Sequence, residues 1–202
     1  MNFFKLSLEP TSASEFISNW SKLYNEGKFS DEEYEKILNR NGSLKPHDIQ
    51  FLLEWKNGNP LSKRKQVIAD KVKKEISIIN EFRQLPNVTD RDFENFWSFV
   101  SSVISYGIVW KVFLVHISKP DEYPIVDQHV LRAWSFLTKG KIEEPKQTLQ
   151  NYQQYRNFFF DLAKQSSKSC RDIDRALMVF GQFLNSQFCS QAIHDHTCLC
   201  LR

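Results

Sequence analysis

The sequence lacks several features that would define a protein class at once. No window of the 202 residues holds an uninterrupted apolar run long enough to span a bilayer, and the first residues lack a signal-peptide layout. No sustained alternation of apolar and polar residues and no internal repeat occurs. A formal net charge of +3 permits nucleic-acid binding but does not argue for it. These absences predict an intracellular, cytoplasmic and mostly or wholly helical protein.

Cysteine is scarce and confined to the last fifth of the chain. The four cysteines are separated by 18, 8 and 1 residues, which matches neither CxxC zinc modules nor the four-cysteine loop of an iron–sulfur protein. We therefore expect no metal and no cofactor. Two histidines near the end leave open a metal-binding tail as an alternative to a loosely packed terminus. The residues concerned are Cys170, Cys189, Cys198, Cys200, His194 and His196.

Apolar residues recur at helical spacing along most of the chain. Ser30 begins a capping-box pattern, and Pro46 stands where the first residue of a helix belongs. Gly181, inside the last helix, indicates close packing against a neighbour. The predicted helices cover residues 11–24, 30–38, 46–55, 62–82, 93–104, 109–117, 127–137, 149–162 and 171–184.

Positive charge gathers on one face of the longest predicted helix, over residues 62–82. One interpretation is a solvated face that keeps the helix soluble, and the other is a surface that meets phosphates. A lone histidine, His116, is expected to be a surface or hydrogen-bonded core residue. The cations of the helix are Lys63, Arg64, Lys65, Lys71, Lys73 and Lys74.

Asp127 stands between an extended segment and a helix. Pro124, Ile125 and Val126 favour an extended approach, and the apolar positions after Asp127 follow helical spacing. One interpretation is a helix cap that accepts a hydrogen bond from the backbone N–H of Val130 or a neighbour. The other is a catalytic carboxylate, because a helix N-terminus holds negative charge in a fixed direction.

The segment Val126-Asp-Gln-His-Val-Leu-Arg132 resembles the aspartate segment of the helix-hairpin-helix (HhH-GPD) DNA glycosylases, Val-Asp-Thr-His-Val-x-Arg. Ser105-Tyr-Gly-Ile-Val-Trp-Lys111 resembles their hairpin, Leu-Pro-Gly-Val-Gly-Arg-Lys, with Val109 in place of the second glycine. Asp174-Arg-Ala-Leu-Met-Val-Phe-Gly181 is similar to a helix in uncharacterised members. The resemblance implies an endonuclease III-like branch without the iron–sulfur cluster, with a two-lobed all-α fold.

The resemblance also implies roles for individual residues. Asp127 would stabilise an oxocarbenium-like transition state or activate the nucleophile during cleavage of an N-glycosidic bond. Lys111 would form a Schiff base, unless it is an ordinary surface lysine on its helix. The hairpin would bind a DNA phosphate through backbone N–H groups. The residues implied in DNA binding are Ser105, Tyr106, Gly107, Val109, His129 and Arg132.

Two other classes of function remain open on the sequence. A non-catalytic DNA- or RNA-binding protein would keep the fold and use Asp127 only as a cap. A glycosidase would keep the chemistry and act on a modified nucleoside or RNA. We expect one domain over residues 1–188, with the hairpin at about 93–118, a tail of unknown role over 189–202, and a monomer that binds duplex DNA with a flipped base.

Overall fold

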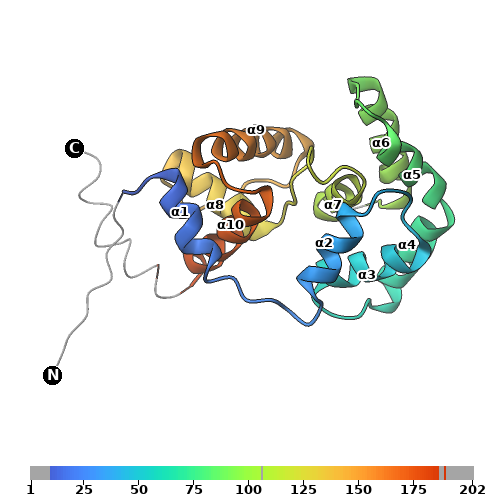
Figure 1. Ribbon diagram of the computed structural model, residues 1–202, viewed down its shortest axis with the longest axis horizontal. Coiled ribbons are helices and arrows are strands. Elements are labelled where there is room, and N and C mark those ends of the chain that lie inside the picture. The colour runs from blue at the N-terminus through green and yellow to red at the C-terminus, as the bar shows by residue number, and fades with distance from the viewer. Residues whose placement is uncertain (1–9, 106, 187–188, 190–202) are drawn as a thin grey trace. The chain divides into compact units, whose positions relative to one another are not determined.

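The computed structural model describes residues 10–105, 107–186 and 189 (Figure 1). Within these residues it contains helices and connecting segments and no strand, which confirms the predicted all-α class. None of the described helices is long and apolar enough to cross a membrane. The helices are α1 (Ala13–Ser21), α2 (Asp31–Asn39), α3 (Pro46–Asn57), α4 (Lys63–Lys74), α5 (Ile76–Gln84), α6 (Asp90–Val103), α7 (Ile108–Ser118), α8 (Gln128–Lys139), α9 (Leu149–Ser166) and α10 (Cys170–Leu184).

The chain divides into two compact units. Unit 1 contains Met1–Tyr24 and Val126–Arg202, and unit 2 contains Asn25–Ile125. In unit 1, α10 packs most extensively against α8 and α1, as Figure 1 shows. Its buried stripe, Ile173, Ala176, Leu177, Phe180 and Leu184, recurs every three to four residues as an amphipathic helix requires. The core of unit 1 is therefore built around α10.

Unit 2 is organised around α7. Every residue of α7 from Val112 to Ser118 is buried, so this helix is apolar on all sides and must be surrounded by others. It contacts α5 and α6, while α3 packs against α2 and α4. Helix α6 and helix α7 follow each other directly, and Gly107 forms the N-cap of α7 with a φ of 78°.

Most predicted helix starts are confirmed, because they depend on local hydrogen bonds. The Ser12 side chain caps α1 in a full capping box, Ser30 accepts from the N–H of Glu33, and Pro46 is the first residue of α3. Thr89 and Asp92 form a second full capping box at α6. Side-chain oxygens here satisfy N–H groups that no helical carbonyl can reach.

The long helix predicted over residues 62–82 is wrong. The structure has two helices, α4 and α5, divided at Glu75, whose φ of −101° and ψ of 24° leave the helical range. No glycine or proline causes this break. Tertiary packing does, since α4 contacts α3 and α6 whereas α5 contacts α7 and α6. The longest helix of the described residues is instead α9, with 18 residues.

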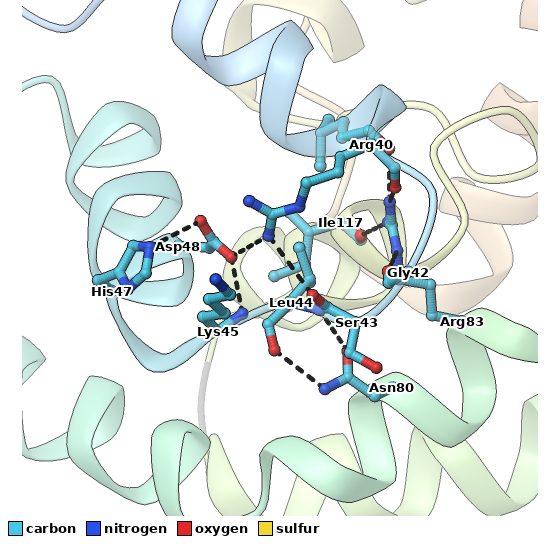
Figure 2. Close-up of polar contacts among 11 residues, drawn as sticks. Arg40, Gly42, Ser43, Leu44, Lys45, His47, Asp48, Asn80, Arg83 and Ile117 are labelled. Carbon is cyan, nitrogen blue, oxygen red and sulfur yellow. Dashed lines mark hydrogen bonds and ion pairs between the residues drawn. The ribbon is translucent and has the colours of Figure 1, made fainter.

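Polar contacts hold the loop between α2 and α3, as Figure 2 shows. The Arg83 guanidinium donates to four carbonyls, those of Leu38 (2.5 Å), Arg40 (3.2 Å), Gly42 (3.2 Å) and Ile117 (2.8 Å). Burial, followed by the charge of Arg40, lowers the pKa of Arg83. The Asn80 amide adds a pair of bonds to the backbone of Leu44, so one side of unit 2 is fixed by two side chains of α5.

Candidate functional site

Asp127 is the N-cap of α8. Its backbone is extended, with a φ of −153°, and its carboxylate Oδ1 accepts from the N–H groups of His129 (2.8 Å) and Val130 (3.0 Å). The cap predicted from the sequence is therefore confirmed. A partly exposed carboxylate held by two backbone donors at a helix N-terminus is both oriented and electrostatically stabilised.

Gly181 of α10 lies directly against this capped turn. A Cβ built on Gly181 would lie 1.9 Å from the carbonyl oxygen of His129 and 2.5 Å from its carbonyl carbon. Real Cβ atoms do not approach backbone so closely, so this position requires glycine. The close packing predicted for Gly181 is confirmed, and the partner is the first turn of α8 after Asp127.

Arg132 lies inside unit 1 and is 3% exposed. Its guanidinium donates to the carbonyl oxygen of Gly181 (3.1 Å), contacts Nδ1 of His129 (3.3 Å) and forms an ion pair with Glu144. These bonds join α8, α10 and the segment before α9. The Arg132 side chain, predicted to contact DNA, is thus buried and links three parts of unit 1.

Tyr155 is a buried polar residue near the aspartate segment that the sequence did not single out. Its side chain is 0% exposed, and its hydroxyl has no hydrogen-bond partner within the described residues. Its ring meets Trp134 of α8 edge-on, with ring centroids 6.3 Å apart. Burial, and then the negative charges of Asp174 and Asp127, raise the pKa of Tyr155 well above its ordinary value. The Tyr155 hydroxyl is therefore protonated and uncharged at neutral pH.

The predicted hairpin region lies in unit 2. Ser105 and Gly107 are exposed and Val109 is half-buried, while Tyr106 lies outside the described residues. Gly107 caps α7 without a side-chain hydrogen bond, and a Cβ added there would meet nothing within 4 Å. The positive φ explains the need for glycine. An exposed helix start without a side-chain cap can present backbone N–H groups to an anion.

Lys111 lies on α7, one turn after this start. Its Nζ is 3.2 Å from Oγ of Ser101 and 5.9 Å from the ring centroid of Trp97, both on α6. Lys111 is half-buried and belongs to unit 2, whereas Asp127 belongs to unit 1. The structure thus brings Lys111 together with α6, and Asp127 together with His129 and Val130.

His116 is a core histidine, one of the two alternatives expected. It is 6% exposed, its Nδ1 is 2.7 Å from the carbonyl oxygen of Tyr123, and its Nε2 is 2.5 Å from the hydroxyl of Tyr34. Because a carbonyl can only accept, Nδ1 carries the proton and Tyr34 donates to Nε2. Both ring nitrogens of His116 are therefore used in packing unit 2.

Unit 2 has a depression of about 410 Å³ that is a second candidate site. Its lining includes three cations, Arg40, Arg83 and Lys119. Figure 2 shows Arg40 directed at Asp48 and Arg83 directed at backbone carbonyls. Lys119 donates to the carbonyl of Leu85. All three cations are occupied by contacts within the unit, so the depression is a weaker candidate than the Asp127 turn.

In the described part of the chain, no three histidine, cysteine or acidic side chains lie close enough together to bind a metal ion. Cys170 and Cys189 are thiols that take no part in a disulfide, and Cys189 is buried. The remaining residues of the tail proposed as a metal-binding alternative, His194, His196, Cys198 and Cys200, lie outside the described residues.

Comparisons with protein-family models, with curated proteins and with solved structures found no match to this chain.

Proposed function

We propose that the protein is a DNA glycosylase that cleaves the N-glycosidic bond of a damaged, mismatched or modified base. The observation that carries this proposal is the capped carboxylate of Asp127, oriented by two backbone N–H groups at the start of α8. The segment around it resembles the aspartate segment of the HhH-GPD superfamily, and the all-α architecture is compatible with that fold.

The chemistry needs a fixed negative charge. As the bond from C1′ of the sugar to the base nitrogen breaks, positive charge develops on the sugar ring, and a nearby carboxylate lowers the barrier. Water then adds to C1′, and the base leaves with its bonding electron pair and takes up a proton. Asp127 is assigned the stabilising role. Gly181 and Arg132 act as positioning residues, since both contact the turn that Asp127 caps.

The start of α7 is assigned to DNA binding. Gly107, with open space around it, allows a phosphate to approach the first N–H groups of α7, and Lys111 adds positive charge one turn later. If Lys111 attacks C1′, the product is a Schiff base that leads to strand cleavage, and its amine must first lose a proton. Water attack leaves an abasic site instead.

One alternative has a specific observation in its favour. The two hydrogen bonds to Oδ1 of Asp127 are those of an ordinary N-cap, so capping alone accounts for them. A non-catalytic DNA-binding protein would use Asp127 in this way only. The same chemistry directed at RNA or a modified nucleoside is the third candidate.

The test compares base release from duplex oligonucleotides that carry a panel of damaged and modified bases. We expect Asp127→Asn to lower the single-turnover rate by about 10²-fold or more. Stability should be nearly unchanged, because asparagine caps helices as well as aspartate does. Asp161→Asn, which removes one exposed charge from α9, is the matched control.

Borohydride trapping in the same assay tests Lys111. A covalent adduct that is lost in Lys111→Ala and kept in Lys36→Ala would establish strand cleavage through a Schiff base. Base release without an adduct would establish the hydrolytic course. If no base is released from any duplex while DNA binding is the same in wild type and Asp127→Asn, the binding protein is the correct assignment. Release from RNA or a nucleoside alone would establish the third candidate.

A further inference from the structure

Helix α4 presents cations to solvent along its whole length. Positions 63, 64, 67, 70, 71 and 74 fall on one side of a helix, and the structure exposes all of them; Asp70 is the one acidic residue among them. Val67, in the middle of this side, is 56% exposed. We call the four cations of this side, Lys63, Arg64, Lys71 and Lys74, the α4 basic face.

The two other cations of α4 are fixed against neighbouring elements of unit 2. Lys73 contacts Oε1 of Gln50 (3.0 Å) and Oδ1 of Asp70 (2.8 Å), and Lys65 donates to Oδ1 of Asn57. The single acidic residue of α4, Asp70, is therefore already paired with Lys73. Lys63, Lys71 and Lys74 have no carboxylate within ion-pair distance among the residues that the structure describes.

This pattern differs from that of solvated lysines elsewhere in the chain. Lys36 on α2 has Glu33 at 3.6 Å, and Lys139 on α8 has Glu143 at 2.9 Å. A face whose only task is solubility usually mixes charges of both signs. On α4, by contrast, Lys63, Lys71 and Lys74 form no such ion pair within the described residues, and Asp70 is the helix's one acidic residue. The helix therefore carries an excess of positive charge, which attracts a polyanion.

Helix α4 contacts both helices that flank Gly107, on different sides. Nζ of Lys65 lies 5.1 Å from the ring centroid of Trp110, in the first turn of α7. At the other end of α4, Lys71, Lys74 and the C-cap residue Glu75 line a depression of about 250 Å³ together with α6, through Phe99, Ser102 and Val103. All these residues belong to unit 2, in which α4 packs against α6.

We propose that the α4 basic face is a docking surface for the sugar–phosphate backbone of duplex DNA, extending the contact made at the start of α7. From Lys63 to Lys74 the helix rises about 16 Å, roughly the axial length of five nucleotides along one strand. The contact is with phosphates and carries no base specificity. The choice of DNA as partner rests on the proposed function, whereas the charge of the surface does not.

The test is the salt dependence of binding to an undamaged duplex, measured by fluorescence anisotropy between 50 and 200 mM salt. Each neutralised phosphate contributes about 0.9 to the slope of log affinity against log salt. Lys71→Gln/Lys74→Gln should lower the slope by about 1.8 and weaken binding to all sequences equally. Lys36→Gln/Lys164→Gln, with the same change of net charge at exposed positions, should leave the slope unchanged.

Single-turnover base release at saturating protein separates this inference from the proposed function. A lowered slope in the α4 variant supports the surface even if wild type releases no base, in which case only the glycosylase assignment fails. A wild-type slope in the α4 variant overturns the surface even if base release is active. Absence of duplex binding by wild type at 50 mM salt overturns it too. The proposal is also overturned if Lys71→Gln/Lys74→Gln weakens binding to vesicles of phosphatidylcholine and phosphatidylserine but leaves the DNA salt slope unchanged. The partner of the surface is then a membrane.

Discussion

Replacing Gly181 with alanine should destabilise unit 1, although alanine is the better helix former. The new Cβ would lie 1.9 Å from the carbonyl oxygen of His129 and 2.9 Å from its Cα. A carbon–oxygen contact of about 3.3 Å is the closest ordinary approach, so α10 and α8 must separate by roughly 1.4 Å. The clash joins two backbones, and no side-chain rotation can relieve it.

The size of the effect follows from two opposing terms. Overpacking costs about 3 kcal/mol at the upper end of its usual range, which suits a rigid contact. Removing glycine from a helix interior returns about 1 kcal/mol. The expected net loss is about 2 kcal/mol in the free energy of unfolding, or a fall of about 4–8 °C in Tm.

Urea denaturation followed by circular dichroism measures this loss, with Gln182→Ala as control because residue 182 is exposed on the same helix. Hydrogen exchange adds a local measurement, since the amides of His129 and Val130 are bonded to Asp127. Both amides should exchange faster in Gly181→Ala. If Gly181→Ala is as stable as wild type, or more stable, the close contact with His129 is refuted. The higher helix propensity of alanine is then the only effect of the substitution.

Two further perturbations test unit 2. Arg83→Met keeps the apolar stem of the side chain but leaves the carbonyls of Leu38, Arg40, Gly42 and Ile117 without their donor. The free energy of unfolding should therefore fall by about 2–4 kcal/mol. Arg91→Met, at an exposed position of α6, is the control and should change it little. Equal stability of the two variants in urea would contradict the role of Arg83. The hydroxyl and backbone N–H of Thr89 hold the pKa of Asp92 below its ordinary 3.8. The unfolded chain therefore binds this proton more readily, so the stabilisation is complete above about pH 4 and is lost as the pH falls through the lower folded-state pKa. Asp92→Asn should flatten the fall in unfolding free energy below about pH 4, and an unchanged acid profile would count against it.

Local sequence patterns anticipated much of the fold, because helix starts depend on residues within three or four positions of one another. The caps at Ser30 and Asp127 and the first-turn position of Pro46 were all predicted on that basis. The break at Glu75 was not, since apolar spacing continues through it and only the separate partners of α4 and α5 require it.

The candidate site divides in the same way. The sequence by itself placed Asp127 at the start of a helix, with a cap as one of two interpretations, and indicated close packing at Gly181, because both features depend on single positions. Only the tertiary structure decided that Gly181 meets His129, that Arg132 is buried, and that Tyr155 is buried against the Trp134 ring. These contacts join residues of α8, α9 and α10 that are about 20 to 50 positions apart. Spacing along a helix predicts which face is buried, and packing alone selects the partner that covers it.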